Sequence, residues 1–348
     1  MKMKTLRNFN FGNKRVLVRC DFNVPLDERG QISDDFRIKK TVPTIEYLVS
    51  KGAKVILMSH LDDPGGKVIE SLRLNKVQQK LSECLGLSVK KAEDCLGKEI
   101  EKLINDTMGQ GEILLLENLR FHKEEEEGDL NFAKELSRMG DIYINDAFSA
   151  CHRAHASIVS LPKYLPSGAG LLLEKEIEVL TNLMERPEKP LLAIVGGKKV
   201  ETKVKFIDKI SEISDFVLIG GLIKKEIGEK KIKLKNPQKI INPVDDNLTF
   251  DIGPKTREYF KKKILKAKTI FWNGPLGMTE KEEFAKGSKE IAQAIIESGA
   301  FSIIGGGETI EFINRIGLVD KFSHISTGGG AMLAFLAGEK LPGIEALR

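Results

Sequence analysis

The sequence contains few cysteines, no long apolar run and none of the commonest zinc or nucleotide signatures. Its four cysteines, Cys20, Cys84, Cys95 and Cys151, have no CxxC spacing, so neither a disulfide framework nor a zinc site is indicated. The five histidines include no HExxH pair, and no Gly-x-x-x-x-Gly-Lys-Ser/Thr motif occurs. A zinc protease and a P-loop enzyme therefore have no support.

Membrane and secretory signals are also missing. No apolar run approaches the length that spans a membrane, and no secretory apolar region follows Met1 to Lys4. The net charge is only +5, which is weak for a nucleic-acid binder and adequate for anionic metabolites. Together with the unpaired cysteines, this predicts a cytoplasmic protein with small-molecule partners and with neither a nucleic-acid nor a membrane partner.

The length and the pattern of apolar runs predict a two-domain α/β protein. A chain of 348 residues suggests two domains of roughly 150 residues each. Apolar runs alternate with helical patterns, which favours parallel sheets with crossover helices. The expected strands are residues 15–18, 54–58, 113–116, 141–144, 191–195, 216–219, 269–272 and 301–304. A long helical pattern over 169–184 ends at two prolines in 185–190, so we place the domain boundary there.

The first expected strand ends in polar residues. Arg15 to Val18 is followed by Arg19-Cys20-Asp21-Phe22-Asn23-Val24-Pro25, and in extended geometry Asp21 and Asn23 share one face. An α/β sheet binds its ligands just beyond the carboxyl ends of its strands. The alternative is a solvated turn in which Asp and Asn serve turn chemistry. Several later strands also end in polar or basic residues, which favours a ligand site.

Glycine turns follow the strands of the second half. Gly196 and Gly197 precede a helix that carries Lys199 and Lys203, four residues apart and therefore on one helical face. Glycines at a strand-to-helix turn let backbone N–H groups approach an anion. An anion would also offset the repulsion between the two lysines. Further glycine pairs and triplets occur at 220–221, 305–307 and 328–330.

The Arg19-x-Asp21-x-Asn23-Val24-Pro25 motif resembles the signature of phosphoglycerate kinases, and matching motifs recur in order to the C-terminus. The resemblance implies two Rossmann-like lobes, each a parallel sheet flanked by helices, joined by a long interdomain helix and a hinge. The implied parts are an N-terminal lobe (1–168), the interdomain helix (169–186), a C-terminal lobe (187–327), and a hinge with a C-terminal segment that returns to the first lobe (328–348).

The resemblance also implies the reaction and the residues that carry it. The reaction moves a phosphoryl group between 1,3-bisphosphoglycerate and ADP, with Mg²⁺ as cofactor, ATP or ADP as co-substrate and a monomeric enzyme. The implied substrate-binding residues are Asp21, Asn23, Arg37, His60, Arg120 and Arg153. The implied nucleotide-binding residues are Gly197, Lys199, Lys203, Gly220, Gly221, Asn273, Pro275, Gly277, Glu280, Gly307, Glu308 and Thr309. Arg37, Lys203, Gly306 and Gly329 are the implied catalytic residues, and Glu308 is the implied metal ligand.

Four features depart from the pattern of the resembled family. Asp63 stands where an arginine is usual, which puts a carboxylate beside the substrate phosphate and is expected to weaken substrate binding. Ser149 replaces a glycine, and Glu308 replaces an aspartate. The segment 222–250 is shortened, and within it only residues 240–245 resemble an expected strand. We therefore expect an incomplete wall around the nucleotide base, weak nucleotide binding and a modest preference for ADP over GDP.

Other interpretations of the same residues remain open. Arg37 can be a solvated helical charge and His60 a hydrogen-bonded structural group, and the acidic run Glu124 to Glu127 is interpreted as a solvated loop or helix start. One alternative function is a degenerate homologue that binds a phosphate ester or nucleotide with little turnover. Another is a dinucleotide-dependent dehydrogenase, which ranks far lower because Ile310 stands where its glycine motif needs Gly or Ala.

Overall fold

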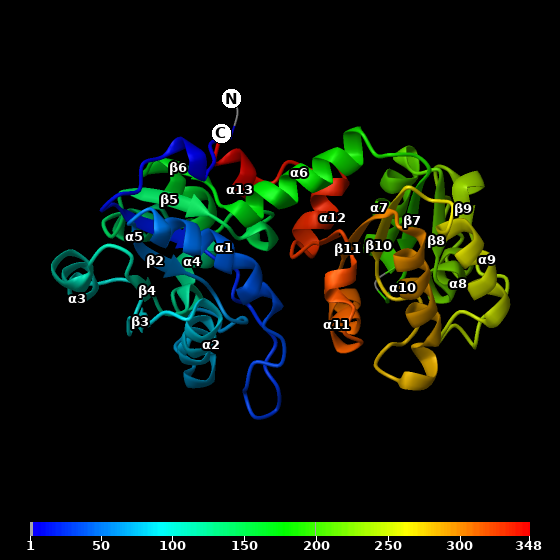
Figure 1. The fold of residues 1–348 in the computed structure, drawn as a ribbon, viewed down its shortest axis with the longest axis horizontal. Helices are drawn as coiled ribbons and strands as arrows, with labels where there is room; N and C mark the ends of the chain where they lie inside the picture. The colour runs from blue at the N-terminus through cyan, green and yellow to red at the C-terminus, as the bar shows by residue number, and fades with distance from the viewer. Residues whose placement is uncertain (1–2, 199) are drawn as a thin grey trace. The chain divides into compact units, whose positions relative to one another are not determined.

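The computed structural model describes residues 3–198 and 200–348. The chain forms two compact units, one of residues 1–177 with 340–348 and one of residues 178–339. Each unit contains one six-stranded sheet, and every strand pair within the sheets is parallel (Figure 1). The predicted α/β fold with two parallel sheets flanked by helices is confirmed. The division between the units falls inside one helix, α6 (Leu171–Glu185).

The sheet of the first unit has the strand order β3-β4-β2-β1-β5-β6. Its central strands are fully buried apolar runs, as expected for strands covered by helices on both faces. The strands are β1 (Arg15–Arg19), β2 (Lys54–Met58), β3 (Val89–Lys91), β4 (Ile113–Leu115), β5 (Ile142–Asn145) and β6 (Ser167–Ala169). The helices are α1 (Phe36–Ser50), α2 (Asn75–Leu85), α3 (Lys98–Lys102), α4 (Lys123–Glu127), α5 (Leu130–Ser137) and α13 (Pro342–Glu345), besides the start of α6.

The last segment of the sequence completes the first unit. Helix α13 packs in this unit (Figure 1), where Gly343 N donates a hydrogen bond to Cys151 O at 2.9 Å. The side chains of Ile344 and Leu347 are both buried. A Cβ on Gly343 would lie 2.9 Å from the Cys151 Cα, so this close backbone approach requires glycine.

The sheet of the second unit has the strand order β12-β11-β10-β7-β8-β9. Its strands are β7 (Leu191–Val195), β8 (Phe216–Ile219), β9 (Ile240–Ile241), β10 (Thr269–Asn273), β11 (Phe301–Gly305) and β12 (His324–Ile325). Its helices are α7 (Val200–Ile213), α8 (Gly221–Glu229), α9 (Pro254–Ile264), α10 (Lys286–Ser298), α11 (Gly307–Arg315) and α12 (Gly330–Leu336).

In both sheets the order of strands reverses beside the first strand. In the first sheet β1 lies between β2 and β5, and in the second sheet β7 lies between β8 and β10. Open α/β sheets bind ligands at such switch points, beyond the carboxyl ends of the strands. The topology therefore assigns one candidate site to each unit.

Three strands were not predicted because they are short edge strands without an apolar run. They are β3, β6 and β12, of which β6 has the sequence Ser-Gly-Ala. As a result α6 begins at Leu171 and not at Ala169. The acidic run forms helix α4, and its Glu125 is fully buried, so the prediction of a solvated segment is wrong for that residue.

Candidate functional site

The first site lies beyond the carboxyl ends of β1, β2 and β5. Asp21 follows β1 and is 2% exposed, and its Oδ2 accepts from Arg37 Nη1 and from Ser149 Oγ. Asn23 Oδ1 accepts from Asp62 N at 2.8 Å. The structure therefore brings Asp21 and Arg37 together. The hydroxyl of Ser149 uses part of the hydrogen-bonding capacity of the same carboxylate.

Arg120 supplies unused hydrogen-bond donors to the same site. It is 4% exposed, and its Nη1 donates to Asp62 O at 2.7 Å. Its Nε forms an ion pair with Glu126 Oε1 at 3.2 Å that lacks hydrogen-bond geometry, and neither Nε nor Nη2 has a hydrogen-bond partner in the described part of the chain. Buried guanidinium donors are rarely left unpaired in folded proteins. An anionic ligand would satisfy them.

Asp63 is exposed beside this arginine. Burial lowers the pKa of Arg120, while the charges of Glu126 and Asp63 oppose that effect. The carboxylate predicted to reduce substrate affinity therefore lies within electrostatic range of Arg120. The preceding residue, Asp62, has a left-handed φ of 56°, which short Asp side chains tolerate better than most.

His60 lies at the carboxyl end of β2 and is 7% exposed. Burial, followed by the positive charges of Arg19, Arg120 and Arg153, lowers the pKa of His60 well below its ordinary value, so the imidazole is neutral at pH 7. Arg153 itself is exposed. The implied substrate-binding residues therefore include a neutral imidazole, which lies within electrostatic range of three guanidinium groups.

The second site is built on two glycine turns at the switch point of the second sheet. Gly197 follows β7 and Gly274 follows β10, and each has a φ of 90°. A Cβ on Gly196 would lie 2.0 Å from Pro275 O, and one on Gly274 would lie 2.1 Å from Gly196 O. The two turns therefore pack backbone against backbone, which only glycine permits.

Lys203 and Asn273 are paired at this second site. Lys203 Nζ donates to Asn273 Oδ1, and the two residues are 9% and 1% exposed. Burial lowers the pKa of Lys203 to about 8, which the charge of Glu308 partly opposes. Asn273 Nδ2 is buried, and it has no hydrogen-bond partner among residues 3–198 and 200–348. An unsatisfied amide donor beside a buried ammonium is suited to an anionic oxygen.

Glu308 faces the same turns from the start of α11. Its side chain is exposed, and its Oε2 would be 3.5 Å from a Cβ placed on Gly197. Gly306, with a φ of 93°, caps α11, and Gly329, with a φ of 51°, caps α12. Thr309 is buried, and its Oγ1 accepts from Gly274 N at 2.8 Å. Thr309 therefore braces the Gly274 turn.

A cavity of about 200 Å³ adjoins the glycine turns. Of the predicted nucleotide-binding residues, it is lined by Gly197, Gly220, Gly221, Pro275, Gly277, Glu280 and Glu308. Lys198 Nζ and Glu280 Oε1 form an ion pair of 2.6 Å in its lining. Lys199 lies outside the described residues, and Lys203, Asn273, Gly307 and Thr309 do not line this cavity.

The shortened segment 222–250 contributes to the wall of this cavity. Leu222, Ile223, Thr249 and Phe250, all from the segment 222–250, line it together with Leu276 and Met278. Phe250 is 41% exposed, and its ring centroid lies 5.1 Å from that of Phe284. Residues from both ends of the shortened segment therefore line the cavity, and the expected incomplete wall around the base stays a prediction.

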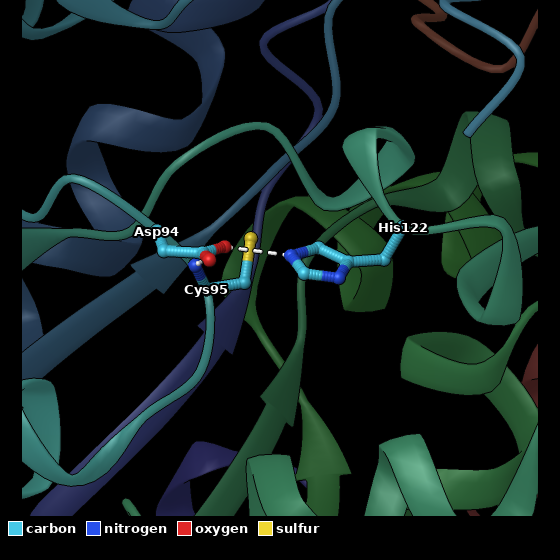
Figure 2. Close-up of side chains that lie close together, drawn as sticks. All are labelled: Asp94, Cys95 and His122. Atoms are coloured by element: carbon cyan, nitrogen blue, oxygen red, sulfur yellow. Dashed lines mark hydrogen bonds and ion pairs between the residues drawn. The ribbon is translucent and has the colours of Figure 1, made fainter. Parts of the chain in front are cut away.

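A third cluster brings together Asp94, Cys95 and His122 (Figure 2), whose potential ligand atoms lie within 4.8 Å of one another. His122 Nε2 and Asp94 Oδ1 are 2.6 Å apart, and the Cys95 thiol donates to Glu117 O at 2.8 Å. Burial raises the pKa of Cys95 well above its ordinary value, and a neutral thiol is a poor metal ligand. These bonds tie the loop after β3 to the segment after β4.

Comparison with known proteins identifies the family. The model of the family described as "Phosphoglycerate kinase" matches residues 6–231 and 224–339. The chain belongs to the phosphoglycerate kinase family. A phosphoglycerate kinase of Dictyoglomus turgidum is 45% identical over an alignment of 389 residues that covers 99% of this chain and 98% of the relative. One of Borrelia garinii is 43% identical, with 100% of each chain covered.

Solved structures of the family share the fold. The crystal structure of phosphoglycerate kinase from Pyrococcus horikoshii superposes with a TM-score of 0.88 at 35% identity, covering 99% of this chain and 98% of that one. The structure of the enzyme from Coxiella burnetii gives a TM-score of 0.81 at 32% identity, covering 99% of each. These relatives leave no support for a dinucleotide-dependent dehydrogenase. Within residues 3–198 and 200–348, no helix is both long and apolar enough to cross a membrane.

Proposed function

We propose that this protein is a phosphotransferase that moves the acyl phosphate of 1,3-bisphosphoglycerate to ADP, giving 3-phosphoglycerate and ATP, and that it catalyses the reverse reaction. ATP and ADP are its co-substrates, and its substrates are small molecules. The observation that carries the proposal is a pair of cationic sites, one in each unit. Each site contains a buried donor, on Arg120 or on Asn273, from which no described residue accepts a hydrogen bond.

The first site is proposed to hold the phosphoglycerate. Arg120 and Arg153 provide guanidinium donors whose planar fork matches phosphate and carboxylate oxygens. Arg37 is held by Asp21 with its side chain still 31% exposed. Together with Asn23 and His60, these residues form the proposed substrate site, in which Asp21 orients Arg37 towards the reacting group.

The second site is proposed to hold the nucleotide. The apolar cavity between Gly220 and Phe250 suits the base, and the backbone N–H groups of the Gly196–Gly197 and Gly306–Gly307 turns suit the phosphates. The ammonium of Lys203 neutralises charge that develops on the phosphoryl group during transfer. Arg37, Gly306 and Gly329 complete the proposed catalytic set, and Lys199, Pro275, Gly277 and Glu280 the proposed nucleotide site.

Mg²⁺ is proposed to bind next to Glu308. The exposed carboxylate at the first turn of α11 is the kind of oxygen ligand that Mg²⁺ prefers, and it faces the phosphate-binding turns near Gly197. When bound to the nucleotide, the ion neutralises phosphate charge. Glu308 retains the carboxylate of the usual aspartate, with one more methylene to reach it.

Three further properties belong to the same proposal. We propose that the enzyme works in the cytoplasm and as a monomer, which fractionation and light scattering would test. The proposed reaction requires the phosphoglycerate and the nucleotide to meet, so we propose that residues 169–186 and 328–348 permit closure of the lobes. A change in small-angle X-ray scattering on adding both ligands would support closure.

A degenerate homologue with little turnover is the second candidate, and Asp63 is the observation that favours it. The deciding experiment is an assay in which 3-phosphoglycerate and ATP drive NADH oxidation through glyceraldehyde-phosphate dehydrogenase. We expect turnover that depends on both substrates and is strongly reduced in Arg37→Ala and Lys203→Ala. Binding of both ligands without turnover would support the degenerate homologue.

A further inference from the structure

A completely buried arginine lies behind His60. Arg19 ends strand β1 and is 0% exposed, and its Nη2 is 3.2 Å from His60 Nδ1. No ligand can reach a group this deeply buried, so Arg19 cannot be a direct substrate contact. Its side chain instead supports the histidine that lines the site.

The other nitrogens of Arg19 are also occupied. Nε donates to Ser157 Oγ at 2.8 Å, and Nη1 donates to Cys20 O at 2.5 Å. The carboxylate of Glu125, also 0% exposed, lies 3.8 Å from Nη2. A guanidinium remains protonated in proteins, and here it is fixed in orientation on three sides.

Glu125 and Ser157 contact the buried guanidinium of Arg19 and are hydrogen-bonded to each other. Ser157 donates its hydroxyl to Glu125 Oε1 at 2.6 Å and its backbone N–H to Glu125 Oε2 at 2.9 Å. The serine hydroxyl hydrogen therefore points at Glu125, and its oxygen is left to accept from Arg19 Nε. This arrangement has one consistent direction of donation, from Arg19 through Ser157 to Glu125.

The direction of donation determines the tautomer of His60. A guanidinium has five donors and no acceptor, so the atom facing Nη2 must be an acceptor, and Nδ1 must carry the lone pair. Burial and the surrounding charges of Arg19, Arg120, Arg153 and His155 keep the ring neutral. Its single proton is therefore on Nε2, which has no hydrogen-bond partner among residues 3–198 and 200–348.

We propose that Arg19 is a positioning residue that fixes His60 as the Nε2–H tautomer, so that the ring presents a donor to an anionic substrate. The opposite tautomer would turn a lone pair towards the anion and would place two donors face to face at Nδ1. The benefit to substrate binding rests on the proposed function. The tautomer itself is a property of the free protein.

The first test is ¹⁵N–¹H correlation spectroscopy of histidine-labelled, ligand-free protein at pH 7, with His60→Asn to assign the signal. We expect an unprotonated Nδ1 and a protonated Nε2 for His60. A protonated Nδ1, as the neutral tautomer or as imidazolium, would overturn the inference. This spectrum decides the tautomer without any variant of Arg19.

The second test removes the arginine without leaving a buried charge. Glu125→Gln serves as the background, and Arg19→Met is added to it. We expect a mixture of His60 tautomers and a rise of about two- to fivefold in KM for 3-phosphoglycerate, because the apparent affinity falls with the fraction of the competent tautomer. The KM for ATP should not change. An unchanged tautomer or an unchanged KM for 3-phosphoglycerate would contradict the positioning role.

Two further variants control these measurements. Arg19→Lys retains a group that only donates, so we expect the Nε2–H tautomer to persist, and this variant decides the question if Arg19→Met fails to fold. Arg15→Met removes another arginine of β1, one that pairs with Asp141 at 2.7 Å, and should leave the His60 signal unchanged. An inactive protein with the expected tautomer would contradict only the proposed function, and an active one with Nδ1–H only this inference.

Discussion

Lys203 Nζ donates a hydrogen bond to Asn273 Oδ1, and the pair joins helix α7 to the end of strand β10. Asn273 cannot neutralise the ammonium, and none of the described residues forms a hydrogen bond with its Nδ2. The pair therefore retains both a positive charge and a free donor, which suits a group that gains negative charge.

The first prediction concerns turnover. Lys203→Ala should lower kcat by about 10²-fold, the usual cost of removing one donor to a transition-state charge, with a smaller change in KM for ATP. Steady-state kinetics of the two variants of the pair, Lys203→Ala and Asn273→Ala, would test this. An equal loss in binding with unchanged kcat would show that Lys203 acts only in the ground state.

The second prediction is the pH dependence that follows from burial of the same lysine. The pKa of Lys203 is lowered to about 8, so the ammonium is present below that pH and is lost above it. The value of kcat/KM should therefore fall as the pH rises through about 8. In Lys203→Arg this alkaline fall should disappear, since a guanidinium stays charged. The same alkaline fall in Lys203→Arg and in the unsubstituted protein would assign the fall to another group.

The third prediction concerns Asp63, whose charge acts on Arg120. A like charge near the substrate phosphate costs on the order of 1 kcal/mol in a partly solvated cleft. Asp63→Arg should therefore lower KM for 3-phosphoglycerate at least fivefold. Asp106→Arg, at an exposed position of the same unit, changes the net charge equally and controls for long-range attraction. Equal effects of the two substitutions would contradict a local role.

The fourth prediction concerns the base. Phe250 is an exposed aromatic ring in a largely apolar cavity wall, and loss of about 100 Å² of apolar contact weakens binding by about 2.5 kcal/mol. Phe250→Ala should weaken the binding of ADP and of GDP to a similar extent. The binding of tripolyphosphate, which has no base, should not change. Calorimetric titration of the three ligands is the direct measurement. Weaker tripolyphosphate binding would mean that the substitution disturbs the phosphate site.

The fifth prediction concerns stability. The hydrogen bond between His122 and Asp94 raises the pKa of His122 and helps to lower the pKa of Asp94. The ion pair therefore stabilises the fold at pH values between the two pKa values. Its contribution disappears as the pH rises through the raised pKa of His122 and as it falls through the lowered pKa of Asp94. Because both groups are partly exposed, the loss in His122→Asn should be under about 1 kcal/mol. Urea denaturation of this variant and Asp94→Asn at pH 5.5 and 9 would test it, and a loss that persists at pH 9 would contradict it.

Most of the central structure could be predicted from the sequence. Strands such as Lys54–Met58 and Leu191–Val195 are apolar runs that end in polar or glycine residues, and burial on both faces leaves that pattern directly in the sequence. The edge strands Val89–Lys91 and His324–Ile325 carry no such pattern. Their positions depend on pairing with distant segments, which local periodicity does not contain.

The candidate sites were predicted in part. The motif from Arg19 to Pro25 indicated Asp21 and Asn23 as site residues. Nothing in the sequence indicated that the charged side chain of Arg19, at the end of an apolar strand, is completely buried. In the acidic run after His122, four adjacent glutamates look equivalent, yet only Glu125 faces Ser157. Which glutamate is buried depends on contacts between segments that lie far apart in the sequence, such as Glu125 and Ser157, which are 32 residues apart.

The position of α13 bears on the order in which the protein forms during synthesis. Residues 340–348 belong to the first unit but leave the ribosome only after residues 178–339. The hydrogen bond from Gly343 N to Cys151 O and the burial of Ile344 must therefore wait for the second unit to be translated. Until then, a nascent first unit exposes the apolar surface that Ile344 and Leu347 later cover.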